Sequence, residues 1–242
     1  MKYTMTLLLF LTLFTSQLLS FDHSHSSFDS ILKKYVSNGR VNYKGIQTEK
    51  SKLEEYLSSL SKVSNSEYNG FSKEQKIAFL INAYNAFTVK LILDNYPVKS
   101  IRKIGGIFQS PWKIEFFELL GSKRHLDWIE HSKLRVDFNE PRIHFAIVCA
   151  SIGCPPLANT AFTPEKLETQ LQSLMENFLK GKNNRYDSKE NILYLSPIFD
   201  WFEKDFIKKG TVIEFVNPSM GNTIPADAKI KYTDYNWNLN EQ

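Results

Sequence analysis

The chain is poor in cysteine, since its 242 residues contain only Cys149 and Cys154. Two cysteines exclude the multi-disulfide framework of small secreted scaffolds and leave one intramolecular bridge to consider. An excess of one charge is also lacking, because 30 Lys and Arg stand against 26 Asp and Glu, and no run of five basic residues occurs. This balance favours neither a nucleic-acid groove nor a polybasic membrane patch. We therefore expect no nucleic-acid partner.

Beyond the amino terminus, the chain lacks any apolar stretch of the length that a membrane span needs. Lys2, the apolar run 4–14 and the small residue Ser20 predict a signal peptide over residues 1–20, cleaved before Phe21. The alternative is an uncleaved anchor, because Leu18 is larger than the residue preferred at that place. We expect residues 21–242 to be exported, periplasmic or secreted, and monomeric, with membrane contact only through an uncleaved signal segment.

Internal repeats and long linkers are absent too, so we expect residues 21–242 to form a single α+β domain. Its predicted architecture is a central mixed or antiparallel sheet packed by several helices. The strongest helical pattern runs from Lys73 to Asn95, with a capping-box signature at Ser72 and Gln75. Further expectations are a loose entry segment over 21–27, a loop over 61–70, a strand-like alternation over 112–116, helices over 126–134 and from Thr163, and strands over 191–195 and 229–232.

Both cysteines lie in the stretch Pro141–Pro156. Its apolar, branched residues predict a buried strand that delivers Cys149 and then Cys154 into a loop. In a strand, His144 and Cys149 would lie about 16 Å apart and on opposite faces. The base of a nucleophilic Cys149 would then be another imidazole, and His131 on the preceding helix is the candidate.

Two amides fall on or near the apolar side of the long helix, Asn85 and, at its edge, Asn82. A buried amide needs hydrogen-bond partners, so it either fixes the backbone of a neighbouring loop or orients a catalytic imidazole. Glu130 or Asp200 could serve as the orienting group instead.

Three other interpretations of the cysteine stretch stay open. Cys149 and Cys154 could form a disulfide, which an exported compartment favours. Cys149 could be a small buried hydrophobe beside a core histidine, His144. Zinc held by these three residues would lack a fourth ligand nearby, so we predict neither a metal nor another cofactor.

A series of short motifs occurs in order along the chain: Val41–Tyr43, Ala78–Ala86, Ile129–His131, Leu134–Arg135, Pro141–Ala146, Cys149–Ser151, Cys154–Pro155, Ser196–Phe202, Asp205–Phe206 and Tyr235–Trp237. Through these motifs the chain resembles the family known as domain of unknown function 547 (DUF547), found in bacterial exported proteins and in plant proteins, from about Phe28 to the carboxyl end. The family brings no established activity. Its plant members often have Ser at the position of Cys154 and keep Cys at that of Cys149, which implies that Cys149 is the working thiol. A more distant resemblance links the chain to papain-like and transglutaminase-like enzymes, although those present the nucleophile at a helix amino terminus.

Two functional hypotheses follow. The first is an exported cysteine-dependent hydrolase or acyl transferase acting on an unknown substrate, with Cys149 as nucleophile, His131 as base, and Glu130 and Asn85 as orienting groups. The second is a non-catalytic ligand- or protein-binding module with a Cys149–Cys154 disulfide. The residues expected to line the substrate pocket are His144, Arg142, Asn82, Ser151, Cys154 and Asp200.

Overall fold

The computed structural model describes residues 20–106 and 108–242. The predicted signal peptide lies outside the described residues, apart from Ser20. The elements in the first half are α1 (Ser26–Tyr35), β1 (Val36–Ser37), β2 (Arg40–Val41), α2 (Tyr43–Thr48), α3 (Lys50–Lys62), α4 (Asn65–Gly70), α5 (Lys73–Asp94), η1 (Ile101–Lys103) and η2 (Pro111–Lys113). They are followed by β3 (Phe117–Leu119), β4 (Ser122–Arg124), η3 (Trp128–Leu134), α6 (Arg135–Asp137), η4 (Pro141–Phe145), α7 (Leu167–Leu179), β5 (Arg185–Asp187), β6 (Ile192–Leu195), α8 (Ile198–Trp201), α9 (Glu203–Phe206), η5 (Ile207–Lys209), α10 (Val212–Val216), η6 (Asn217–Met220) and β7 (Lys229–Tyr232). The α+β class is confirmed.

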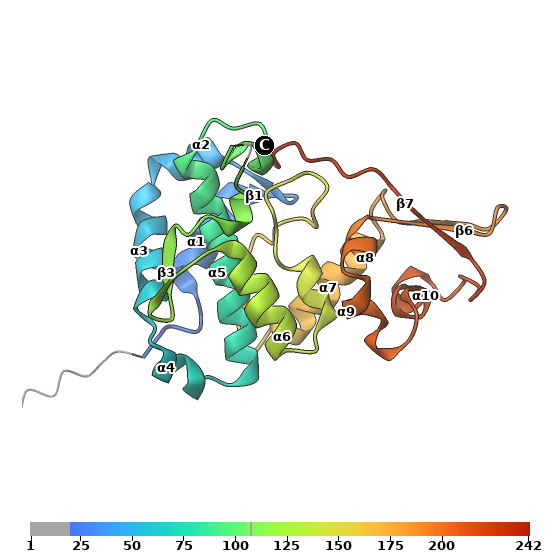
Figure 1. Cartoon of the computed structure of the whole chain (residues 1–242), viewed down its shortest axis with the longest axis horizontal. Coiled ribbons are helices and arrows are strands. Elements are labelled where there is room, and N and C mark those ends of the chain that lie inside the picture. Colours follow the sequence, from blue (N-terminus) through green and yellow to red (C-terminus); the bar gives the residue numbers. More distant parts are fainter. Residues whose placement is uncertain (1–19, 107) are drawn as a thin grey trace, which may run out of the picture.

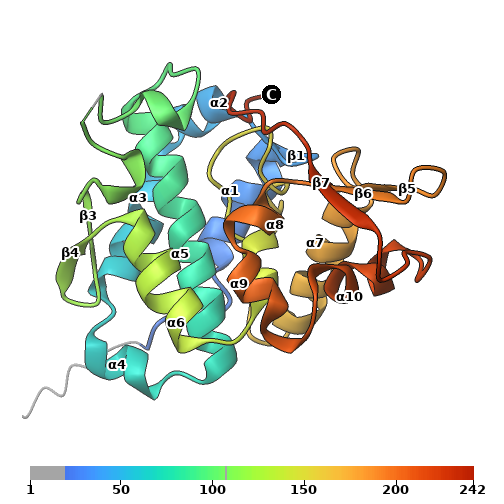
Figure 2. The ribbon, with the colours of Figure 1, turned by 45° about the vertical axis from the view of Figure 1, so that its right-hand side comes forward.

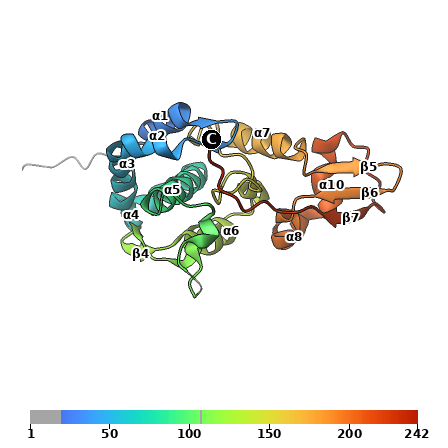
Figure 3. The same cartoon turned by 90° about the horizontal axis from the view of Figure 1, so that it is seen from above.

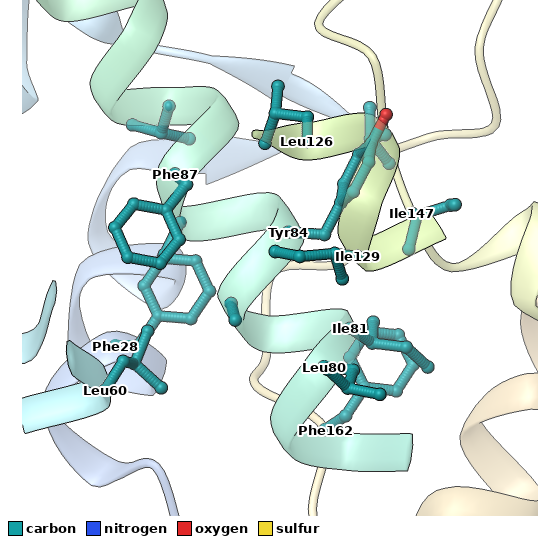
Figure 4. Packing of buried hydrophobic residues seen from close by; sticks show 14 of the residues in the cluster. Phe28, Leu60, Leu80, Ile81, Tyr84, Phe87, Leu126, Ile129, Ile147 and Phe162 are labelled. Carbon is teal, nitrogen blue, oxygen red and sulfur yellow. The ribbon is translucent and has the colours of Figure 1, made fainter. Parts of the chain in front are cut away.

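Helix α5 occupies the centre of the amino-terminal half, with α1, α2, α3 and α6 around it (Figure 3). The predicted capping box is present, since Ser72 and Gln75 each bond the other's backbone N–H. By length and composition α5 could cross a membrane, yet 89% of its apolar window is buried inside the structure. It is therefore the core helix of the domain. Figure 4 shows Ile81 and Tyr84 extending from it towards Ile129 and Ile147.

The described residues contain three small sheets and no central one. Strands β1 and β2 form one antiparallel pair and β3 and β4 another, while β5, β6 and β7 form the third sheet, in which β6 and β7 are parallel. The strands predicted over 191–195 and 229–232 are confirmed as β6 and β7. The strand-like alternation at 112–116 belongs instead to η2 and the segment leading to β3.

The strand expected at Ile143–Val148 is also wrong. Pro141 lies in the first turn of η4 and the Glu140 side chain accepts a hydrogen bond from the Arg142 N–H, so the segment begins as a 3₁₀ helix. Its apolar residues are buried because the segment passes between two cores: Phe145 belongs to one and Ile147 to the other. When nearly all residues of a short segment are apolar, hydrophobic periodicity cannot distinguish a strand from a helix.

The larger core surrounds α5, and the smaller one lies among α7, α8, α9, α10 and the three-stranded sheet (Figure 1). After β7 the chain runs back over the molecule to end near α2 (Figure 1). This tail hydrogen-bonds to both the first hairpin and the cysteine segment, because the Val41 N–H donates to the Asn240 carbonyl and the Asn240 N–H to the Ala150 carbonyl. The tail thus connects the start of the fold to the site.

Two segments expected to be loose are ordered. Phe21 packs edge-on against Phe79 with ring centroids 5.2 Å apart, and His25 is buried, with Nδ1 2.7 Å from the Tyr56 hydroxyl. Residues 65–70 form α4, because the Ser64 side chain caps this helix through the Glu67 N–H. The Ser- and Asn-rich composition of residues 61–70 predicts a loop, and the capping role of Ser64 does not stand out among the neighbouring serines.

Candidate functional site

A cavity of about 260 Å³ lies where the two halves of the chain meet. It collects side chains from α5, η2, η3, η4, the cysteine loop, α8 and the tail. Several predicted residues reach it: Glu130, His131, His144, Cys149 and Cys154. The other lining residues are Tyr84, Ser110, Trp112, Asp127, Ile147, Pro155, Ile198, Trp201, Phe202, Tyr235 and Trp237.

His144 is 3% exposed and is held by a carboxylate that the sequence analysis did not single out. Its Nε2 lies 2.8 Å from Asp205 Oδ2. Burial raises the pKa of Asp205, but hydrogen bonds from His144 and Arg135 outweigh it and hold that pKa well below its ordinary value. An ionised carboxylate only accepts hydrogen bonds, so the His144 proton is on Nε2 and the lone pair of the neutral ring is on Nδ1.

The Nδ1 atom of His144 has no hydrogen-bond partner among the described residues. The Glu130 carboxyl group is close to it, with Oε1 3.9 Å from this nitrogen. Burial lowers the pKa of His144, although Asp205 opposes the shift, so the ring is neutral at pH 7. The ring also stacks on Phe202, with centroids 4.0 Å apart, which fixes its plane. His144 therefore presents an oriented, unprotonated nitrogen inside the site.

Glu130 is 7% exposed and lies beside that nitrogen. Burial raises its pKa to about 7, and the charge of Asp127 adds to the rise, while Arg135 and a hydrogen bond from Tyr84 oppose it. A pKa near neutrality lets this carboxyl group carry a proton at a pH where an ordinary glutamate has lost it. A group in this state can both donate and accept a proton.

His131 lies in the same wide π-helical turn as Glu130, but its ring is used differently. Its Nδ1 is 2.9 Å from Arg135 Nη1, and because a guanidinium only donates hydrogen bonds, this nitrogen must be the acceptor. The ring proton is then on Nε2, 3.7 Å from Asp127 Oδ1. Burial lowers the pKa of His131, although Asp127 opposes the shift. The lone pair that a general base needs is therefore already occupied.

Arg135 connects the two histidines. Its Nε lies 2.5 Å from Asp205 Oδ2, and this contact joins α6 to α9, which lie next to each other (Figure 2). The order of the network is His131, Arg135, Asp205, His144. Of the two imidazoles, only that of His144 has a buried ring nitrogen without a hydrogen-bond partner among the described residues.

Cys149 and Cys154 form a disulfide, so neither is a free thiol in the described structure. The Tyr235 hydroxyl lies 3.2 Å from the Cys149 sulfur and 3.1 Å from the Cys154 sulfur. The Ser151 hydroxyl is 3.2 Å from the Cys149 sulfur and 3.0 Å from the Tyr235 oxygen. Two hydroxyl groups thus surround the sulfur of Cys149.

The backbone of the cysteine loop is pinned by the tail. The Ile152 N–H donates to the Asn238 carbonyl and the Gly153 N–H to the Asn236 carbonyl, at 2.9 and 2.8 Å. A Cβ on Gly153 would lie 2.9 Å from the Tyr235 ring, so glycine is required for this approach. Ala150, next to Cys149, has φ of 57°, a left-handed conformation that is unfavourable for alanine.

Some residues that were expected at the site lie elsewhere. Asn85 and Asn82 are buried and bond backbone groups of other segments: Asn85 contacts Ala146 and Val148, and Asn82 contacts Phe162 through both amide atoms. They therefore fix loops, which is the first of the two roles considered for them.

The other displaced residues are Arg142, Asp200 and Ser151. Arg142 binds the carboxylates of Glu140 and Glu168 and lines a separate cavity. Asp200 is exposed and does not line the 260 Å³ cavity. Ser151 contacts the Cys149 sulfur through its hydroxyl but is not among the residues that line the cavity.

Several side chains at or next to the cavity were not predicted from the sequence, chiefly Asp205, Asp127, Arg135 and Tyr235. Asp205 is 61 residues from His144 along the chain, and Tyr235 is 86 residues from Cys149. No local spacing links such pairs; the only available signal was their position in the motifs that carry the family resemblance. Within the described residues no cluster of three His, Cys, Asp or Glu side chains is arranged to hold a metal ion.

Comparison with known proteins identifies one family. Residues 68–179 match the model of a family described as "Protein of unknown function, DUF547". No curated protein and no solved structure matches the chain. The resemblance to papain-like and transglutaminase-like enzymes is accordingly unsupported, and Cys149 follows an irregular segment rather than beginning a helix.

Proposed function

The chain belongs, through residues 68–179, to the DUF547 family of proteins of unknown function, and from the chemistry of its cavity we propose that it is a cysteine-dependent hydrolase or acyl transferase. In this proposal His144 is the general base, Glu130 the general acid, and Cys149 the nucleophile once the bridge to Cys154 is reduced. Asp205 orients the imidazole. The matched region contains the three reacting residues, whereas Asp205 and Tyr235 lie beyond it.

The observation that carries the proposal is the unoccupied Nδ1 of His144. A buried imidazole whose other nitrogen is fixed by a carboxylate, and whose lone pair lies 3.9 Å from a carboxyl group with a raised pKa, is arranged for proton transfer rather than for packing. The base assignment therefore moves from His131 to His144, because Arg135 occupies the lone pair of His131.

The reaction would proceed in balanced steps. An external dithiol reduces the bridge and is itself oxidised to a disulfide. The Cys149 thiol transfers its proton to His144 Nδ1, the thiolate attacks the acyl carbon, and the leaving group takes a proton from the Glu130 carboxyl group. Water, or an acceptor alcohol or amine, then attacks the thioester and gives its proton to the Glu130 carboxylate, while the departing sulfur recovers its proton from His144.

The test is the hydrolysis of p-nitrophenyl acetate and butyrate by the protein with and without a dithiol reductant. We expect ester hydrolysis by the parent protein only after reduction. Cys149→Ala should abolish this hydrolysis, and His144→Gln should lower its rate by at least about 100-fold. The matched control is His131→Gln, which removes the other cavity imidazole and is expected to change the rate less than about tenfold. Reduced Cys149→Ala hydrolysing as fast as the reduced parent protein would refute the nucleophile.

A second candidate function is a non-catalytic binding module, and the bridged state of Cys149 and Cys154 favours it. In that case the reduced protein hydrolyses neither ester, and iodoacetamide labels the cysteines only after reduction. Ester hydrolysis that requires Cys149 would exclude this candidate.

Export with cleavage before Phe21 also belongs to the proposal. The Phe21 backbone nitrogen lies 2.9 Å from the Glu67 carboxylate, so cleavage would leave a positively charged amine beside a carboxylate. A disulfide is in keeping with an oxidising compartment. We expect the protein recovered from the periplasm or the medium to begin at Phe21, as measured by amino-terminal sequencing and intact mass. A mass that includes residues 1–20 would show an uncleaved anchor.

A further inference from the structure

Aromatic side chains are concentrated at the cavity. The chain has four tryptophans, and three of them, Trp112, Trp201 and Trp237, line it. Trp201 is 46% exposed, one of the most exposed large hydrophobic residues among those described. A large apolar ring kept in contact with solvent at the edge of a cavity is typical of a binding surface.

These rings form one continuous wall. Trp201 and Trp237 are 5.8 Å apart and nearly parallel, and Trp112 meets Trp237 edge-on at 6.0 Å. Tyr235 joins both neighbours, with its centroid 4.8 Å from Trp201 and 4.5 Å from Trp237. The wall combines η2, α8 and the tail, three segments that are distant in the sequence. The fold, not a local motif, builds this wall.

The acidic side chains that line the cavity are not accompanied by basic Lys or Arg side chains in the described part of the chain. Asp127 and Glu130 contribute the carboxyl groups. Both lining histidines are neutral at pH 7, since burial lowers the pKa of each. Arg135 is nearby, but Asp205 and His131 already bind its guanidinium. A cation therefore meets acidic and aromatic groups here, and no free positive charge lines the cavity.

One ring of the wall already binds a cation. The guanidinium of Arg102, which is not a lining residue, lies 5.0 Å from the centroid of Trp237. Attraction between a cation and the face of an indole ring is strongest when water is excluded. The same ring system, open to the cavity through Trp201, is suited to an alkylated ammonium group.

We propose that the cavity binds an alkylammonium group, with Trp201 and Trp237 as the aromatic surface and Asp127 as the counter-charge. That this group is part of the acyl substrate rests on the proposed function; that the cavity binds it does not. A neutral ligand of the same shape would bury the Asp127 carboxylate without a partner, which is unfavourable. Choline and its uncharged isostere, 3,3-dimethylbutan-1-ol, have nearly the same shape and differ in the positive charge.

The experiment is calorimetric titration of the protein, bridge intact, with choline, tetramethylammonium and 3,3-dimethylbutan-1-ol. Because no turnover is needed, absence of ester hydrolysis leaves the result unaffected. We expect saturable binding of both cations at a dissociation constant at least about tenfold below that of the alcohol. Trp201→Ala and Asp127→Asn should each weaken choline binding about tenfold or more.

The control is Trp128→Phe, which changes the one tryptophan that does not line the cavity and should leave choline binding as it is. Equal binding of choline and the alcohol would overturn the proposal in favour of a merely apolar cavity. Absence of cation binding, or choline binding that survives both Trp201→Ala and Asp127→Asn, would overturn it as well.

Discussion

At the scale of single residues, burial decides the chemistry of this site. Glu130 and His144 are both buried, and each is shifted towards its neutral form. Asp205 is the exception, because two hydrogen-bond donors, His144 and Arg135, keep it ionised despite burial. An acid, a base and an orienting carboxylate therefore coexist within one network at neutral pH.

Glu130→Gln should remove a pH dependence of stability. The pKa of Glu130 is about 7 in the folded chain and about 4.5 ordinarily, so between these values the folded protein keeps a proton that the unfolded chain releases. The free energy of unfolding therefore falls as pH rises from 4.5 to 7, by about 3 kcal/mol. The groups facing this carboxyl are Asp127, Arg135, Tyr84, Asp205 and His144.

Urea denaturation of both proteins at pH 5, 6, 7 and 8 measures this effect. We expect the free energy of unfolding of the parent protein to drop relative to that of Glu130→Gln, with most of the drop below pH 7. His131 and His144 titrate in both proteins, so Glu130 is the titrating group that differs between them. Parallel curves would show that Glu130 is not protonated in the fold.

Tyr235→Phe should slow the labelling of reduced Cys149. The Tyr235 hydroxyl is 3.2 Å from this sulfur and can donate a hydrogen bond to a thiolate. Its loss should reduce the rate of iodoacetamide labelling at pH 7 by about tenfold. Mass spectrometry after trypsin digestion measures the labelled fraction at Cys149. Tyr186→Phe, which removes a hydroxyl that donates to Asn191 instead of contacting a sulfur, is the matched control. Equal slowing in both variants would contradict the assignment.

At the scale of elements, the segment that leads into Cys149 has no strand partner among the described residues and is held by a helix instead. The Asn85 amide of α5 donates to the Ala146 carbonyl and accepts from the Val148 N–H, both at 2.9 Å. Side-chain amide bonds thus replace the sheet ladder that was predicted for residues 143–148. One helix positions the cysteine segment and, through Tyr84, also forms part of the cavity wall.

Asn85→Ala and Asn82→Ala form a matched pair that separates positioning from stability. Each removes an amide with two buried backbone hydrogen bonds, so both should lower the free energy of unfolding by about 2–4 kcal/mol. Only Asn85→Ala releases the segment before Cys149 and should change the labelling rate of the reduced thiol. Urea denaturation and iodoacetamide labelling measure the two effects. Equal labelling in both variants would limit Asn85 to a stabilising role.

Several elements follow from the sequence because their signals are local. The long helix α5 carries its own capping box, and its end precedes Pro97. Strands β6 and β7 follow from alternation and flanking polar residues. By contrast, the turn preference of Pro141 and the contacts of Asn85 override the β-branched composition of residues 143–148.

At the scale of the whole molecule, the carboxyl-terminal tail completes the site. Tyr235 reaches both sulfurs, Trp237 belongs to the aromatic wall, and Asn240 bonds Ala150 beside Cys149. The tail also pairs with Val41 near the start of the fold. Residues of the carboxyl-terminal tail therefore complete the site. Hydrogen bonds of the same tail connect the site to the amino-terminal half of the fold.

The bridge should matter little for global stability. It closes a loop between residues only five positions apart, and the chain-entropy model gives about 2 kcal/mol for so short a loop. Domains of this kind have total stabilities of about 5–15 kcal/mol, so the reduced protein should stay folded. Urea denaturation with and without a phosphine reductant measures the difference, and the Cys149→Ala/Cys154→Ala double variant should show none. Unfolding on reduction would exclude a working thiol form.

The sequence by itself determined the α+β class, the central helix and the stretch that carries the cysteines, and it indicated the family whose model residues 68–179 match, because those signals lie within short windows of residues. It also identified Glu130, His131, His144, Cys149 and Cys154, all of which line one cavity. Only the tertiary structure decided which imidazole has an unoccupied lone pair, which carboxylate orients it and which rings form the wall. Those roles depend on burial and on contacts between distant segments, such as Trp112 with Trp237 and Cys149 with Tyr235, and no local pattern encodes them.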